Sequence, residues 1–180
     1  MKKFVALLRG INVSGQKIIR MADLRNLFNT LGFESIKTYL QSGNVIFSSE
    51  AEKPRLISEQ IRTRIIEQFG FDVEVLVLGC QQIKQITEAN PFVSPPQKEI
   101  KWLHVTFPSQ AVTEKVFESL ELPVQEGEAA VLAEQAVYLY CPNGYGRTKI
   151  NNGYFEKKLG FACTTRNWKT VLALTELCQE

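Results

Sequence analysis

Two short segments near the start of the chain carry residue types that bind anions. Arg9-Gly10-Ile11-Asn12 follows a five-residue apolar run, and Gln41-Ser42-Gly43-Asn44 lies between two β-prone segments. Arginine, asparagine and serine side chains donate hydrogen bonds, and glycine lets a ligand approach the main chain. The loop that continues to Gly15 matches neither the Walker A nor the GxGxxG pattern. We interpret these residues as ligand-binding, with the alternative that the asparagines and serines only satisfy turns.

A third polar segment, Thr164-Thr165-Arg166-Asn167-Trp168, precedes an apolar pattern with helical spacing. We expect a helix over about 166–177, with Thr164 or Thr165 as its N-cap and Trp168 in the core. An arginine in the first turn opposes the helix dipole, so we expect an anion beside Arg166. That anion is either a protein carboxylate or a ligand. Arg166 and Asn167 therefore join the candidate ligand-binding residues.

The other reactive residues form no catalytic or metal-binding pattern. His104 is the only histidine, and its alternation with Ile100 and Trp102 predicts a histidine packed within a sheet. The carboxylates are spread over predicted helix faces and loops, without the grouping that a metal needs. The four cysteines lie far apart and include no Cys-x-x-Cys pair. We expect no metal, no cofactor and reduced thiols.

The net charge is only +2, but its distribution is uneven. Residues 1–44 hold seven basic and two acidic side chains, and residues 143–169 hold six basic and one acidic. The rest of the chain is therefore acidic. Two basic segments on an otherwise acidic protein indicate an anionic partner, a nucleotide or a nucleic acid.

Composition indicates a soluble globular protein, with 44% hydrophobic and 22% charged residues. Arg9 interrupts the apolar run of residues 4–8, which is too short for a signal peptide. No segment reaches the ~20 apolar residues that cross a bilayer, so we expect no membrane span and a cytoplasmic location. A homo-oligomer is possible, but no pattern indicates one.

The first half of the chain predicts a β-α-β-β-α-β order. Apolar runs at 4–8, 36–41, 45–48 and 73–78 are typical of strands, and helical spacing occurs at 24–31 and 54–69. This is the order of the ferredoxin-like fold, whose antiparallel sheet has the strand order 4-1-3-2. The end of the first strand then lies beside the start of the third. We therefore expect Arg9–Asn12 and Gln41–Asn44 to meet.

The second half predicts a further α+β subdomain. A proline-rich segment at 90–96 is a plausible linker, so we divide the chain into 1–90 and 98–180. A strand at 100–107, a helix at 109–120 and strands at 129–133 and 137–140 follow. The glycine-rich loop 143–146 and two helices, at 151–159 and 166–177, complete the chain. The recurring β-α-β-β order indicates a degraded copy of the first half.

Three stretches together resemble the bacterial domain of unknown function 1697 family. They are Arg9-Gly10-Ile11-Asn12-Val13, Thr38 to Val45, and Glu156 to Gly160 with Thr165 to Thr170. The resemblance implies two α+β subdomains with a ferredoxin-like first half, and it implies no activity. One departure is Ser14, where the family loop usually has a second glycine beside Gly15.

These observations leave three functional hypotheses. The first is an anion-binding protein that uses Arg9, Asn12, Ser42 and Asn44 together with Arg166 and Asn167. The second is a small-molecule enzyme in which Arg9 or Arg166 stabilises negative charge without a histidine base. In the third, the polar side chains are purely structural and staple the subdomains together.

Overall fold

Contacts divide the chain into two units. The structure is a computed structural model that describes residues 1–95 and 97–180. The first unit contains residues 1–83 and 174–180, and the second contains residues 84–173. The division into independent domains 1–90 and 98–180 stays a prediction. Its proposed linker, 90–96, includes Pro96, which lies outside the described residues.

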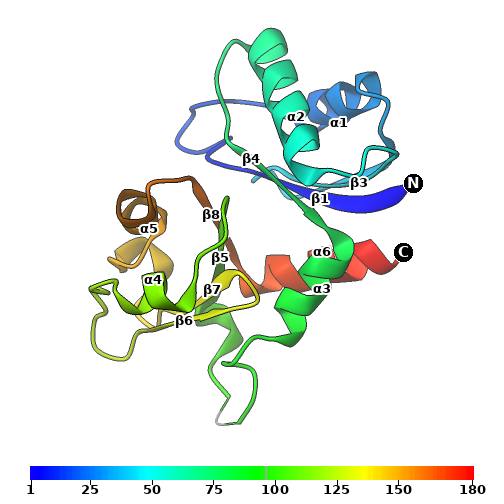
Figure 1. The fold of residues 1–180 in the computed structure, drawn as a ribbon. Helices are drawn as coiled ribbons and strands as arrows, with labels where there is room; N and C mark the ends of the chain where they lie inside the picture. Colours follow the sequence, from blue (N-terminus) through cyan, green and yellow to red (C-terminus); the bar gives the residue numbers. More distant parts are fainter. Residues whose placement is uncertain (96) are drawn as a thin grey trace. The chain divides into compact units, whose positions relative to one another are not determined.

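The first unit contains one four-stranded antiparallel sheet with the order β2-β3-β1-β4. Its strands are β1 (Lys2–Leu8), β2 (Glu34–Tyr39), β3 (Asn44–Ser49) and β4 (Val75–Gly79). The helices α1 (Met21–Thr30) and α2 (Pro54–Phe69) interleave with them, and α3 (Cys80–Glu88) follows β4. The predicted ferredoxin-like order is confirmed, and α1 and α2 lie on one face of the sheet (Figure 1).

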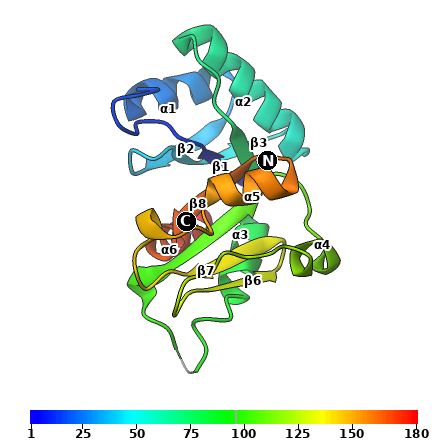
Figure 2. The ribbon, with the colours of Figure 1, turned by 90° about the vertical axis from the view of Figure 1, so that its left-hand side faces the viewer.

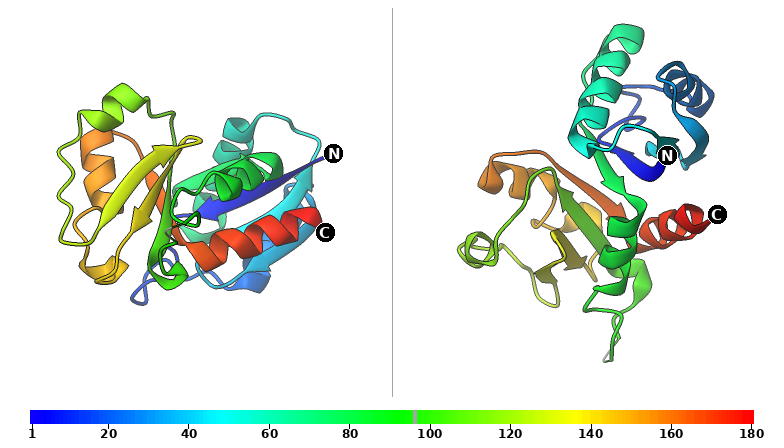
Figure 3. Two further views of the ribbon diagram at one scale, coloured as in Figure 1. Left: turned by 90° about the horizontal axis from the view of Figure 1, so that it is seen from below. Right: turned by 45° about the vertical axis from the view of Figure 1, so that its right-hand side comes forward.

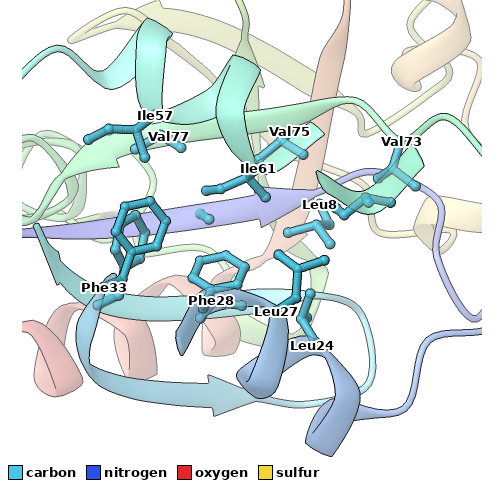
Figure 4. Close-up of a cluster of buried hydrophobic side chains, with 14 of the residues drawn as sticks. Leu8, Leu24, Leu27, Phe28, Phe33, Ile57, Ile61, Val73, Val75 and Val77 are labelled. Atoms are coloured by element: carbon cyan, nitrogen blue, oxygen red, sulfur yellow. The ribbon is translucent and has the colours of Figure 1, made fainter. Parts of the chain in front are cut away.

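Apolar side chains at helical spacing join α1 and α2 to the sheet. Leu24, Leu27 and Phe28 of α1 are fully buried, as are Ile57 and Ile61 of α2. They pack against alternate residues of the strands, as period-two geometry requires (Figure 4). This core fixes the strands whose ends carry the candidate site.

The second unit repeats the same topology. Its antiparallel sheet has the order β6-β7-β5-β8, which corresponds position by position to β2-β3-β1-β4. The strands are β5 (Leu103–Pro108), β6 (Ala129–Ala133), β7 (Ala136–Tyr140) and β8 (Cys163–Asn167). The helices α4 (Glu114–Glu118) and α5 (Asn152–Leu159) interleave with them, and α6 (Trp168–Gln179) follows β8. Figure 2 shows α5 beside β8. Phe155 of α5 shares a core with Val137 and Leu139 of β7.

The last helix was predicted to begin at Arg166 with Thr164 or Thr165 as its N-cap, and this start is wrong. Residues 163–167 form β8, which pairs with β5 so that Arg166 lies opposite Val105. The helix begins at Trp168, and its cap is Asn167, whose Oδ1 accepts a hydrogen bond from the Thr170 N–H at 2.8 Å. Pairing with β5 and the β-branched threonines outweigh the local helical spacing. Arg166 therefore lies on the strand that precedes α6 and not in the first helical turn.

The cysteines also differ from the prediction. Cys80 at the start of α3 and Cys178 near the end of α6 form a disulfide, with their Cα atoms 5.5 Å apart. Cys141 and Cys163 are not part of this disulfide, and both are buried. Because the two bonded residues are 98 positions apart in sequence, only the folded chain brings them together.

Smaller differences concern the edges of elements in the second unit. A 3₁₀ turn, Ile100–Trp102, occupies the start of the predicted strand, so β5 begins at Leu103. The helix predicted at 109–120 is confined to α4, where the Thr113 side chain accepts a hydrogen bond from Val116 N. None of the helices in the described ranges combines the length and the apolar character needed to cross a membrane.

Candidate functional site

The two predicted polar loops meet at one end of the first sheet. We call Arg9–Asn12 and Gln41–Asn44 the rim. The Leu8 N–H donates a hydrogen bond to the Gly43 carbonyl at 2.8 Å, which continues the β1–β3 pairing into the rim. Gly43 is buried with φ +76°, and a Cβ on it would lie 2.7 Å from the Leu8 Cβ. Only glycine fits this approach without displacing β1.

The Asn12 side chain locks one rim loop to the other. Its Nδ2 donates hydrogen bonds to the carbonyls of Ile19, at 2.9 Å, and Gln41, at 2.8 Å. Its Oδ1 accepts a hydrogen bond from the Ile19 N–H at 2.9 Å. Both amide hydrogens are therefore committed to the main chain, and Asn12 acts here as a brace.

Asn44 has a similar role at the β2–β3 turn. It is fully buried, and its Nδ2 donates to the Tyr39 carbonyl at 2.8 Å and to the Ser42 Oγ at 2.9 Å. These bonds close the turn that carries Gln41 and Ser42, which are exposed. The rim residues that face solvent are consequently Gly10, Gln41 and Ser42, with Arg9 half-buried.

The loop that follows the first rim segment has an unusual backbone. Gly10, Asn12, Ser14, Gly15 and Lys17 all have φ values between +47° and +74°. Residues other than glycine and asparagine rarely have φ values in this region, and those that do are concentrated at functional sites. Ser14, where the resemblance leads us to expect glycine, has φ +50°.

The charge near the rim is mainly positive. Residues 9–22 and 35–49 contain no aspartate or glutamate, and the side chains of Arg20 and Arg25 are exposed. Arg25 donates a hydrogen bond to the Thr38 Oγ1 at 2.7 Å, which places its guanidinium beside β2.

Two carboxylates border the rim, but both are paired. The Arg9 N–H bonds to the Glu74 carbonyl, and the Lys17 Nζ bonds to the Asp72 carbonyl. Arg62 contacts the Asp72 carboxylate at 2.6 Å and the Glu74 carboxylate at 2.8 Å. The hydrogen bond from Arg62 holds the pKa of Asp72 below its usual range. The two carboxylates share one guanidinium, and the charge of Lys17 also lowers the pKa of Asp72, so these acids offset part of the positive charge on the loop.

Arg166 and Asn167 belong to the second unit. Arg166 is buried on β8, where its Nη1 donates to the Thr165 carbonyl at 3.0 Å. Burial lowers the pKa of Arg166 to about 10, so the guanidinium still carries its charge near neutral pH. Asn167 is exposed, and its side-chain oxygen caps α6. The structure thus shows a structural role for the Asn167 oxygen.

Thr165, next to Arg166 on β8, belongs to a polar network that was not predicted from the sequence. The Thr165 hydroxyl donates to the Asn152 Oδ1 at 2.6 Å and is 2.7 Å from the Thr106 hydroxyl. His104 stacks on Tyr145 with 4.7 Å between ring centroids, and burial lowers the pKa of His104. The prediction of a histidine packed within a sheet is confirmed. The helical interpretation of 164–165 hid this network, because it removed the strand that carries it.

No metal centre is formed by the part of the chain that the structure describes. His, Cys, Asp and Glu side chains nowhere gather there in groups of three or more that could hold an ion.

Comparison with known proteins identifies the family. The model of a family described as "Protein of unknown function (DUF1697)" matches residues 1–138. The chain belongs to this family. The matched range includes both rim segments and β1–β6, and it ends within β7.

A solved structure shows the same fold over nearly the whole chain. The conserved bacterial protein SP0830 from Streptococcus pneumoniae is similar with a TM-score of 0.76 and 23% sequence identity, and the match covers 98% of each chain. At this identity the likeness establishes the fold alone. No curated protein matches the chain. Membership of the DUF1697 family and the similar solved structure therefore indicate the fold and do not indicate an activity.

Proposed function

We propose that this DUF1697 protein binds an anionic ligand, a nucleotide or a short nucleic acid, at the rim and the adjoining start of α1. The observation that carries the proposal is that residues 9–22 and 35–49 themselves contain no carboxylate side chain and expose Arg20, Arg25 and the rim residues Gly10, Gln41 and Ser42. Exposed positive charge attracts phosphates.

The start of α1 adds main-chain donors to this surface. Arg20 is the N-cap residue, and its side chain accepts no hydrogen bond from the first turn of α1. The first N–H groups of a helix lack partners within the helix and favour an anion. Asp23 lies in this turn, and its carboxylate would repel a phosphate. A bound phosphate would therefore lie beside Arg20, at the beginning of the turn.

The rim provides rigidity to the proposed site. Asn12 and Asn44 hold the two loops by main-chain bonds, which supports the structural hypothesis for these two side chains. Ligand contacts then fall on Arg9, Gly10, Gln41 and Ser42. Arg166 and Asn167 stay candidates from the sequence, and the proposal does not depend on them. We also propose a cytoplasmic location for this binding.

Binding of ATP and of a short single-stranded RNA at low salt tests the proposal. The double variant Arg20→Gln, Arg25→Gln should fold normally because both side chains are exposed. We expect it to weaken binding about tenfold and to reduce the salt slope by about 0.7 for each RNA phosphate contact that it removes. Arg55→Gln is the matched control, since Arg55 is exposed on α2 and pairs with Glu59.

Two outcomes would contradict the proposal. One is no affinity for either probe at low salt. The other is binding that the double variant and the control weaken equally. Recovery of ATP unchanged after incubation supports a binding protein, whereas its conversion would favour the enzyme hypothesis at the same surface.

A further inference from the structure

The first unit has a second polar site, at the other end of β1. A pocket of about 190 Å³ lies on the face of the sheet opposite the α1/α2 core, and its lining includes Lys3, Ser35, Lys37, Ser48 and Glu180. Lys3 and Arg9 are six residues apart on an extended strand, or about 20 Å. We propose that this pocket is a binding site for the phosphate group of a small molecule, and that the Glu180 carboxylate occupies it in the absence of ligand.

Strand register brings the donors of the pocket together. Lys3 on β1 lies opposite Ser48 on β3, and Lys37 on β2 lies opposite Ile46 on β3. Because side chains alternate along a strand, these residues face away from Phe4 and Phe47, which are in the core. Leu177 and Glu180 of the C-terminal segment complete the lining. Figure 3 shows the end of α6 running along the sheet on the side where β1 begins.

The backbone of the edge strand β2 is irregular where it borders this pocket. The β2–β3 register shifts between Glu34 and Lys37, and Ser35 within the shift has φ +51°. A bulge redirects side chains and is common beside binding sites. Here it lies at the point where Ser35 and Lys37 line the pocket.

The pocket already holds an anion from the protein itself. The Lys37 ammonium is hydrogen-bonded to the Glu180 carboxylate. This hydrogen bond and the charges of Lys37 and Lys3 lower the pKa of Glu180. The side chains of Lys37 and Glu180 are 47% and 57% exposed, so a ligand from solvent can reach the lysine. An exposed pair of this kind is weak enough to be displaced.

The donor set suits phosphate better than carboxylate. Two ammonium groups and two serine hydroxyls line the pocket and can all donate hydrogen bonds to the oxygens of a phosphate group. Lysine is a common phosphate ligand as a compact positive charge. Of these four residues, Lys37 is the one whose hydrogen bond to Glu180 the structure shows among the described residues. The pocket volume admits a phosphate group, while the remainder of a small ligand would extend into solvent.

The Cys80–Cys178 disulfide fixes the internal anion near its site. Cys178 lies between Leu177 and Glu180, which both line the pocket, and the bond attaches it to the end of β4. The carboxylate is therefore held at a high effective concentration, which makes it a competitor for any external anion.

Calorimetric titration with inorganic phosphate at low ionic strength tests the proposal. Glu180→Gln removes the internal anion and should raise the affinity for phosphate about threefold or more. Glu176→Gln is the matched control, because Glu176 is exposed on α6, four residues before Glu180, and does not line the pocket. Adding Lys37→Gln to the Glu180→Gln variant should lower the affinity about tenfold, whereas adding Lys53→Gln should not.

Either of two results would contradict the phosphate-site proposal. If Glu180→Gln and Glu176→Gln bind phosphate equally, or if Lys37→Gln leaves the affinity of the Glu180→Gln variant unchanged, the pocket is not a phosphate site. The Arg20→Gln, Arg25→Gln variant should bind phosphate here as the wild type does. Its loss of RNA or ATP binding therefore tests the rim alone, and the two proposals can fail separately.

Discussion

The Asn12 side chain joins the two rim loops by donating a hydrogen bond to the Gln41 carbonyl at 2.8 Å, across 29 positions of sequence. The same amide donates to Ile19 and accepts from it, so one residue satisfies three main-chain groups. Neither loop has regular secondary structure at these points. The shape of the rim consequently depends on this amide.

Asn12→Ala should destabilise the protein by about 1–3 kcal/mol, because it leaves the Gln41 and Ile19 groups without their partner. Urea denaturation followed by circular dichroism measures the loss. Asn26→Ala is a control on the exposed surface of α1. Unchanged stability of Asn12→Ala would show that water replaces the amide without penalty.

Gly43→Ala should lower the unfolding free energy of the protein more than Asn12→Ala does. The new methyl group would lie 2.7 Å from the Leu8 Cβ and 2.8 Å from the Ile11 Cδ1, and φ at this position is +76°. Overpacking and the left-handed backbone together should cost about 3 kcal/mol of unfolding free energy. Gly10→Ala has similar φ but open space around it, so it should cost less. Equal losses would show that backbone conformation, not contact with Leu8, requires glycine.

The first unit could be predicted from local patterns because its apolar periodicity is clean. Leu24, Leu27 and Phe28 specify α1, and the strand order of the ferredoxin-like fold then brings Gly10 and Gly43 to one rim. The hydrogen-bond partners of Asn12 could not be predicted in the same way. They depend on the path of the 13–18 loop, which is set by left-handed residues that sequence alone does not mark.

The predictions from sequence were wrong where contacts between residues far apart in the sequence determine the structure. Residues 163–167 are polar and precede a helix, and only pairing with β5 makes them a strand. Cys80 and Cys178 have no spacing motif, since the disulfide follows from the return of α6 to the first unit. The pocket around Lys37 and Glu180 was missed for the same reason.

Ser14→Gly should stabilise the protein. Ser14 is exposed and has φ +50°, where an L-residue is strained by about 1–2 kcal/mol relative to glycine. The greater freedom of glycine in the unfolded chain offsets part of this gain, so we expect a net increase of about 0.5–1 kcal/mol in unfolding free energy. Ser109→Gly, which is exposed and has no positive φ, should show no increase. A loss of stability in Ser14→Gly would mean that the serine side chain has a role of its own.

Breaking the disulfide should lower stability in a way that reductant reproduces. Cys178→Ser removes a cross-link between residues 98 positions apart, and such bonds typically contribute about 2–4 kcal/mol. Denaturation of the wild type in dithiothreitol should show the same loss, and reductant should have no effect on the variant. A wild-type midpoint that is insensitive to reductant would show that the bond does not form in solution.

The stability of the protein should also depend on His104 as the pH falls below about 7. Burial lowers the pKa of His104 in the folded state, so the unfolded chain binds a proton first as the pH falls through about 6.5. The contribution of neutral His104 is present above that pH and is lost as the pH falls toward the folded-state pKa. His104→Phe keeps a ring against Tyr145 but does not titrate. The difference in unfolding free energy, wild type minus His104→Phe, should decrease on acidification, and a constant difference would show that His104 is not desolvated.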